Sequence, residues 1–182
     1  MIETWLRSNR RVILLGSLPV LVTALLGWWL HTVGSSPGVK ILAVCLLLFS
    51  LGLGILLGMQ LLRPRVAYGE GQVLFYLRAG RPIAVPIEVI EAFFLGQGPA
   101  YLPGMPEDKQ ETINLVARLS QKEPQWSHQD VKPALGRWCE GYVSIRGTWC
   151  EPLTNEVVRR LNRRLAEVSR EWASTRPAGA SP

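Results

Sequence analysis

Few side chains in this 182-residue sequence have the type and spacing that catalysis requires. Glu88 and Glu91, just after Pro86, come closest to a catalytic carboxylate pair. On a helix they would share a face, whereas on a strand they would point to opposite faces. General acid–base chemistry needs two carboxyl groups held across a substrate, usually where the surroundings perturb one pKa. The hydrophobic residues that flank this pair favour a solvated edge instead.

A metal site or a nucleophilic pair would have to draw on His128, Cys139 and Cys150. A single histidine in a polar stretch cannot hold a metal without ligands from elsewhere in the chain. Cys139 and His128 could form a nucleophilic pair, but no local signature supports one. A phosphate-binding glycine loop follows a strand and opens a helix. The segment Gly69-Glu70-Gly71 follows no predicted strand and opens no helix. We therefore expect no catalytic residues, no cofactor and no metal, and leave the role of the cysteines open.

Two uncharged runs of 22 residues each, Val12–Val33 and Ile41–Leu62, dominate the first third of the chain. Lys40 is the one charged residue between Arg11 and Arg63. A helix of this length rises about 33 Å, enough to cross a hydrocarbon core of about 30 Å. A buried helical pair in a soluble core would need a larger protein around it. The sequence therefore predicts a transmembrane hairpin over 12–62, with spans at 12–33 and 41–62.

A cleaved signal peptide would also begin with basic residues followed by an apolar run. Its apolar region would normally span only about 7 to 15 residues and end at a small-residue cleavage site. Here the run ends in Trp28-Trp29-Leu30-His31. Aromatic residues at the end of a long span are typical of an uncleaved anchor with interfacial side chains.

The net charge of +6 lies mainly beside the two spans. Basic residues precede the first span and follow the second, whereas residues 66–182 carry a net charge of only +1, which argues against a nucleic-acid partner. Short basic flanks stay cytoplasmic, so we expect an inner-membrane protein with both termini, including segment 1–11, in the cytoplasm. The basic flanks are Arg7, Arg10, Arg11, Arg63 and Arg65.

Three cysteines without C-x-x-C spacing agree with a reducing compartment. Neither span contains Asp, Glu, Lys or Arg, the residues that usually mark ion pathways, so we do not expect transport by this chain.

Small residues form a stripe on each span that lets helix backbones approach closely. They could pack the hairpin onto itself, or they could join two copies through the second span. A hairpin with so short a turn must bury one face within itself, which favours the first interpretation. The stripe residues are Thr23 and Gly27 in the first span and Ser50, Gly54 and Gly58 in the second.

After Arg65 the hydrophobic pattern becomes that of strands. Val73–Leu77 and Ile83–Pro86 flank a turn and predict a β-hairpin, whereas Ile87–Leu95 fits a strand or a short helix. Alternating residues over Thr112–Leu119 and Tyr142–Trp149 predict two half-buried strands. Residues 98–111 read as an exposed loop, and 120–137 as polar and turn-rich with no predicted element.

The last element is an amphipathic helix. Its apolar residues recur every three or four positions, Thr154 is placed to cap it, and 175–182 has the composition of a disordered tail. The apolar stripe comprises Val157, Leu161, Leu165, Val168 and Trp172.

Strands followed by one helix predict an α+β domain over 63–174, a small bent sheet or barrel with the helix closing one end. The pattern resembles bacterial membrane-anchored pleckstrin-homology-like (PH-like) domains. The likeness is carried by Arg78–Pro86, by Val85-Pro86-Ile87-Glu88-Val89-Ile90-Glu91 and by Gly141-Tyr142-Val143-Ser144-Ile145-Arg146-Gly147. In such domains the loop between the first two strands often contacts a ligand, and the resemblance places Arg78 and Arg81 there.

A basic cluster on the predicted helix could lie against an anionic leaflet, or it could be an ordinary solvated face. It consists of Arg159, Arg160, Arg163 and Arg164. Our leading expectation is a non-catalytic membrane protein whose PH-like domain binds an unknown protein in a membrane assembly. Recognition of anionic lipid by the helix arginines with Arg78 and Arg81 is the alternative, and an uncharacterised membrane enzyme is the third.

Overall fold

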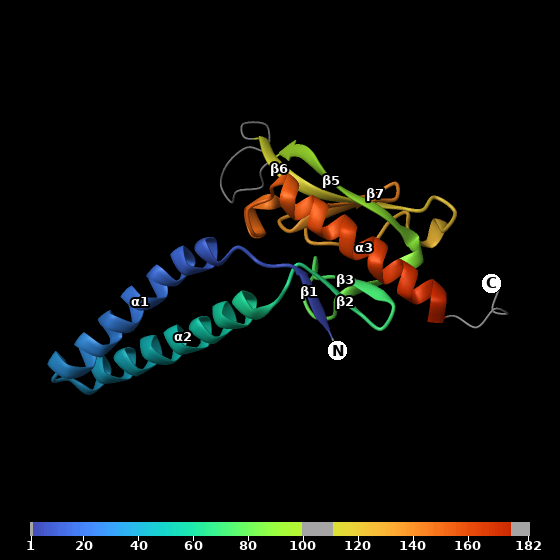
Figure 1. The fold of residues 1–182 in the computed structure, drawn as a ribbon. Helices are drawn as coiled ribbons and strands as arrows, with labels where there is room; N and C mark the ends of the chain where they lie inside the picture. The colour runs from blue at the N-terminus through green and yellow to red at the C-terminus, as the bar shows by residue number, and fades with distance from the viewer. Residues whose placement is uncertain (1, 100–110, 176–182) are drawn as a thin grey trace. The chain divides into compact units, whose positions relative to one another are not determined.

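The computed structural model describes residues 2–99 and 111–175, and it divides into two units (Figure 1). The helical unit is Ser8–Arg63, and the sheet unit combines Met1–Arg7 with Pro64–Pro182. Most of the predicted loop at 98–111 and nearly all of the predicted tail at 175–182 lie outside the described residues.

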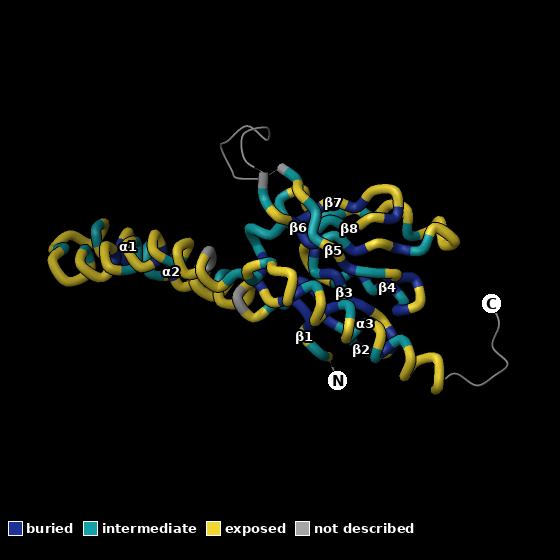
Figure 2. The backbone as a smooth tube through the Cα atoms, turned by 45° about the horizontal axis from the view of Figure 1, so that its top comes forward, coloured by how far each residue is buried: buried dark blue, intermediate teal, exposed yellow. Residues whose placement is uncertain are grey.

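Two long helices make up the helical unit: α1 (Arg10–Val33) and α2 (Pro37–Leu62). Asn9 and Ser36 cap them, each accepting a hydrogen bond from a backbone N–H of the first turn. Both helices are long and apolar enough to cross a membrane, and Figure 2 shows them exposed along nearly their whole length. Lys40, predicted in the loop, lies instead in the first turn of α2, because Ser36 and Pro37 start that helix earlier than the uncharged run begins.

In its described residues, the sheet unit has two antiparallel sheets of four strands each. The first sheet has the order β1-β2-β3-β4 and the second β5-β6-β8-β7. The first comprises β1 (Glu3–Leu6), β2 (Val66–Gly69), β3 (Gln72–Phe75) and β4 (Ile83–Pro86). The second comprises β5 (Ile90–Pro99), β6 (Glu111–Leu119), β7 (Gly136–Cys139) and β8 (Tyr142–Ile145). The mixed α+β architecture expected from the sequence is therefore present.

The first strand was not foreseen, because residues 1–11 were read as a cytoplasmic segment before the membrane. Glu3–Leu6 instead pairs with β2, whose residues lie on the far side of both long helices in the sequence. A four-residue run ahead of an apolar span has too little pattern to predict a strand, because its partner is about sixty residues away. The helical unit is thus inserted between the first two strands of the sheet unit.

The turn Glu70-Gly71 joins β2 to β3, so the expectation that Gly69-Glu70-Gly71 follows no strand was wrong. It opens a strand and not a helix, which leaves it unlike a phosphate-binding loop.

The structure also shows which elements form in two stretches whose sequence pattern did not decide the secondary structure. The Ile87–Leu95 segment contains both predicted alternatives, a 3₁₀ turn (η1, Ile87–Val89) followed by β5. The region 120–137 ends in β7, which the sequence did not predict, and β7 turns into β8 through Glu140 and Gly141. Their φ angles of 51° and 77° fit the tight two-residue turns that join antiparallel strands.

Helix α3 (Asn155–Thr175) packs its predicted stripe into the core formed by the two sheets. Val157, Leu161, Leu165 and Val168 are buried, and Thr154 Oγ1 accepts a hydrogen bond from Val157 N at 3.4 Å. Trp172, the last stripe residue, is 37% exposed, and its Nε1 donates to Glu88 Oε1 at 2.8 Å. The apolar face of the helix therefore belongs to the same hydrophobic core as the buried residues of both sheets.

Asn162 on α3 covers the open edge of β5, one of the two edge strands of the second sheet. Its Oδ1 accepts from Phe93 N at 2.7 Å, and its Nδ2 donates to Phe93 O at 2.7 Å. The side-chain amide thus takes the place of a neighbouring strand's peptide group, which protects an edge that could otherwise pair with another chain.

Candidate binding surface on the second sheet

The outer face of the second sheet, turned away from the core, presents side chains in register across all four strands. Phe94, Val116, Ser144 and Arg137 lie side by side on β5, β6, β8 and β7. The adjacent row is Ala92, Arg118, Tyr142 and Cys139. Their sequence neighbours Phe93, Leu115, Ala117, Val143, Ile145 and Trp138 are buried in the core. This face is therefore built by the same alternation that builds the core.

Aromatic and basic side chains stand out on this outer face. Phe94 and Tyr142 are 38% and 39% exposed, and their rings meet edge to face with centroids 6.3 Å apart. Beside them, Arg118 pairs with Glu91 at 2.8 Å, and Arg137 is exposed on β7. Tyr, Phe and Arg are the residue types most enriched where proteins meet other proteins.

A trough of about 670 Å³ runs over this face, between the strands and the segment 128–133. The charged residues that line it in the described part of the chain are Arg137, Arg146 and Asp130, an excess of one positive charge. The polar lining includes Gln97, Asn114, His128, Gln129, Ser144 and Cys139. We refer to it below as the trough.

Asn114 and Arg146 fix the shape of the trough. The Asn114 side chain is only 5% exposed, and its Oδ1 accepts from Gly147 N at 3.2 Å. Arg146 Nε donates to Pro133 O at 2.7 Å, which ties the end of β8 to the wall segment. A β-carbon at Gly98 would approach Asn114 Nδ2 to 2.7 Å, so a residue without a side chain suits this position. These contacts hold floor and wall in place before any ligand binds.

His128 and Cys139, weighed from the sequence as a possible nucleophilic pair, both line the trough. In the described part of the chain, no three His, Cys, Asp or Glu side chains gather as a metal site would require. Glu88 and Glu91 are not paired with each other: Glu88 accepts from Trp172, and Glu91 binds Arg118. The two carboxylates are thus engaged in separate contacts.

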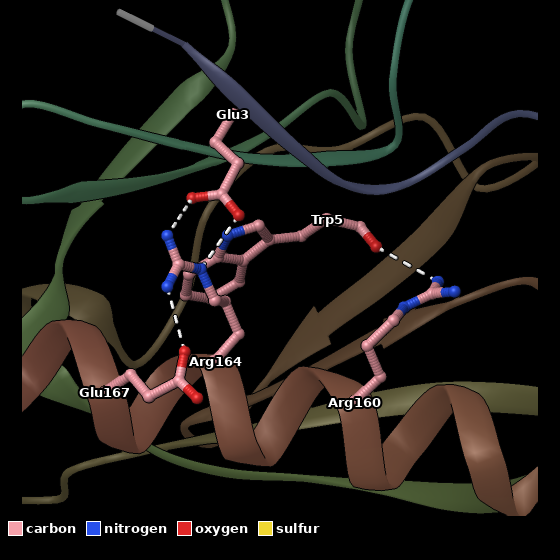
Figure 3. A network of polar contacts seen from close by, with 5 residues as sticks. All are labelled: Glu3, Trp5, Arg160, Arg164 and Glu167. Atoms are coloured by element: carbon pink, nitrogen blue, oxygen red, sulfur yellow. Dashed lines mark hydrogen bonds and ion pairs between the residues drawn. The ribbon is translucent and has the colours of Figure 1, made fainter.

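The basic cluster of α3 divides into two pairs. Arg164 binds Glu3 through two nitrogens, at 2.8 and 2.9 Å, and Glu167 through a third at 2.8 Å (Figure 3). Arg160 donates to Glu151 Oε1 at 2.8 Å and to the Trp5 carbonyl at 3.4 Å. Both arginines therefore fasten β1 to α3. Arg159 and Arg163 are exposed.

The Glu3–Arg164 contact shifts both ionisation equilibria. The hydrogen bonds from the Arg164 guanidinium lower the pKa of Glu3 below its ordinary value. The two carboxylates raise the pKa of Arg164, so it stays charged under all ordinary conditions.

Arg65, expected at the membrane border, is buried in the sheet unit at 5% exposure. Its Nε donates to Trp149 O at 3.2 Å, and burial lowers its pKa. The neighbouring Cys150 thiol is buried too, and its pKa is raised to about 12. Arg65 lies in the sheet unit and not at the membrane border because Leu6 of β1 pairs with the next residue, Val66.

Arg78 and Arg81 lie in the turn between β3 and β4, and Arg78 Nε donates to Arg81 O at 3.1 Å. The turn of the predicted hairpin does carry both arginines, but it joins the third and fourth strands and not the first two, because β1 and β2 both precede β3.

Most of the small-residue stripe meets inside the hairpin. Thr23 Oγ1 and Ser50 Oγ lie 2.8 Å apart, and a β-carbon at Gly27 would come within 3.2 Å of the Ala43 carbonyl. At Gly54 a β-carbon would lie 3.9 Å from Val20, whereas at Gly58 no described atom lies within 4 Å. Gly58 is thus the stripe residue with open space beside it.

The sequence reading missed the residues that define the outer face: Phe94, Arg137 and the trough walls. Alternation on β6 and β8 was visible, but β7 was unrecognised, so nothing linked Arg137 to Ser144. Comparison with models of protein families, with curated proteins and with solved structures finds no match to this chain.

Proposed function

We propose that this chain is a membrane-anchored binding module that docks a partner protein on the outer face of its second sheet. The observation that carries the proposal is the face itself, where exposed aromatic and arginine side chains border a trough whose walls are fixed by internal hydrogen bonds. Interfaces typically combine such anchors with a polar surround.

The helical unit supports the anchoring half of the proposal. Two apolar helices are followed and preceded by basic residues, a distribution that favours a cytoplasmic location for both ends of the hairpin. On this proposal, the sheet unit works at the inner face of the cytoplasmic membrane.

Two four-stranded sheets with a C-terminal helix support a PH-like relationship for the sheet unit. The insertion of both helices between β1 and β2 departs from the simple order of anchor followed by domain. The exposed surface, and not a family relationship, therefore supports the docking function.

Site-specific photo-cross-linking in intact cells tests the docking face. A photoreactive phenylalanine analogue in place of Tyr142 should give a discrete adduct with another protein. The same analogue in place of Glu171, exposed on α3, is the matched control and should give none. Absence of an adduct at Tyr142, or the same adduct at both positions, would refute docking on this face.

Contact with anionic lipid is a second candidate function. The position of Arg78 and Arg81 in the turn between β3 and β4 favours it. Leu6, Val66, Phe75 and Ile83 are in register across one end of the first sheet. At that end the chain leaves for α1 and returns from α2, and the Arg78–Arg81 turn lies just beyond Phe75 and Ile83. Juxtamembrane arginines gain about 1 kcal/mol each beside an anionic leaflet.

Reconstitution tests this candidate. Accessibility of the β3–β4 turn to protease should fall when anionic lipid is added to neutral vesicles, and Arg78→Ala with Arg81→Ala should abolish that protection. Protection that is independent of lipid charge would rule the candidate out.

A further inference from the structure

We infer that the trough binds a short acidic segment of the partner protein in an extended conformation. This inference rests on the proposed docking function and names the chemistry that the surface would select.

The charge of the residues that line the trough favours an acidic ligand. Among the residues that the structure describes, Arg137 and Arg146 line the trough together with one carboxylate, that of Asp130. Arg137 pairs with Ser144 in the β7–β8 ladder, and Arg146, whose Nε donates to Pro133 O, follows Ser144 by two residues. Guanidinium groups bind carboxylates through two parallel hydrogen bonds, which gives geometric selectivity as well as attraction.

The size of the trough favours a short peptide segment over a single small anion. The trough reaches from Gly98 on β5 to Arg137 on β7, across four strands. At about 4.8 Å between strands this is a span of about 14 Å, which about four residues of extended chain would cover. A volume of about 670 Å³ suits a ligand of that size, whereas one phosphate or one carboxylate would fill a small part of it.

The aromatic side chains on the same face favour a segment that also carries an apolar group. Phe94 and Tyr142 lie on the same face as Ser144 and Arg137, in the same row or the next. An acidic segment that carries an apolar side chain could place its carboxylates at the arginines and its apolar group against these rings. Because Asn114 and Arg146 already hold the floor and wall, binding loses little entropy in ordering the site.

Fluorescence anisotropy on the full chain in an uncharged detergent tests the inference. The probe is a labelled hexapeptide, Glu-Leu-Glu-Glu-Leu-Glu, and its counterpart has lysine at each glutamate. We expect saturable binding of the acidic peptide alone, weakened about tenfold or more by Arg137→Glu. Arg159→Glu, an equal charge change on the exposed face of α3, should leave the affinity within about twofold.

Four results would overturn the inference: no saturable binding, equal binding of the lysine peptide, no effect of Arg137→Glu, or full competition by millimolar inorganic phosphate. The last would identify a site for small anions. If Arg137→Glu fails to fold, Arg137→Gln tests the same contact without reversing charge. A Tyr142 cross-link without acidic-peptide binding would refute only the acidic chemistry, whereas peptide binding without a cross-link would refute only the proposed docking function.

Discussion

At the scale of single residues, Asn162 shows how one amide can complete a sheet. It satisfies both the N–H and the C=O of Phe93, which would otherwise be left unpaired beside α3. Removing one partner of a buried hydrogen bond costs about 1 to 3 kcal/mol. Asn162→Ala should therefore lower the free energy of unfolding by about that amount in denaturant titrations.

Arg163→Ala, one position away and exposed, is the control for Asn162→Ala and should change stability little. Equal stability of Asn162→Ala and wild type would show that the amide does not support β5.

Glu3 makes stability depend on pH in the acid range. Its pKa is lower in the folded chain than in the unfolded chain, because Arg164 binds the carboxylate. Its contribution is therefore complete above the ordinary value near 4.5 and is lost as the pH falls through the lower, folded pKa. We expect the melting temperature of Glu3→Gln to fall less steeply with acid than that of wild type.

Glu171→Gln, at an exposed position, should retain the wild-type slope. If Glu3→Gln shows that same slope, the carboxylate does not stabilise β1 through Arg164.

The two thiols of the sheet unit should react at very different rates. Cys139 is exposed on the outer face, whereas Cys150 is buried and its pKa is about 12, so almost no thiolate forms near neutrality. A maleimide at pH 7.5 should label Cys139 within minutes and Cys150 only after unfolding, as measured by mass spectrometry of peptides. Comparable rates in the folded chain would contradict the burial of Cys150.

At the scale of elements, the hairpin helices differ in how closely they approach at each glycine. A side chain at Gly27 would meet the Ala43 carbonyl and Leu46, whereas Gly58 has open space. Gly27→Leu should therefore lower the melting temperature of the chain in detergent by several degrees, and Gly58→Leu should leave it nearly unchanged.

The same two variants address association between copies. If Gly58→Leu destabilises the chain as much as Gly27→Leu, or converts an oligomer into a monomer on size-exclusion chromatography, then Gly58 contacts another copy and the internal packing described here is incomplete.

Elements with strong internal periodicity were the ones that could be predicted. The stripe of α3 and the alternation of β6 and β8 lie within single segments, so local sequence was sufficient to find them. β1 and β7 have four residues each, as β8 does, but no alternating run extends beyond them as Tyr142–Trp149 extends beyond β8. Their identity therefore depends on partners or turns that the local pattern does not reveal.

The contacts of the basic cluster and of the trough could not be predicted either, because they require β1 and β7. Arg159, Arg160, Arg163 and Arg164 could be found as a cluster, but the ion pair with Glu3 could not be foreseen without β1. Likewise, the two arginines of the trough come together only through the β7–β8 hairpin.

At the scale of the whole molecule, the insertion of both helices between β1 and β2 changes how the anchor relates to the domain. The sheet unit is connected to the helical unit at two points, Arg7–Ser8 and Arg63–Pro64. Glu3–Leu6 thus belongs to the folded first sheet and not to a free N-terminal segment.

We propose a membrane-held sheet unit whose outer face is open to the cytoplasm, and labelling of Cys139 tests both properties. The most direct measurement is labelling of Cys139 by a membrane-impermeant maleimide, in a chain with Cys45→Ala and Cys150→Ala, in intact cells and in inverted membrane vesicles. We predict no labelling in intact cells and rapid labelling in inverted vesicles. Rapid labelling in intact cells would place the sheet unit outside and refute a docking face in the cytoplasm.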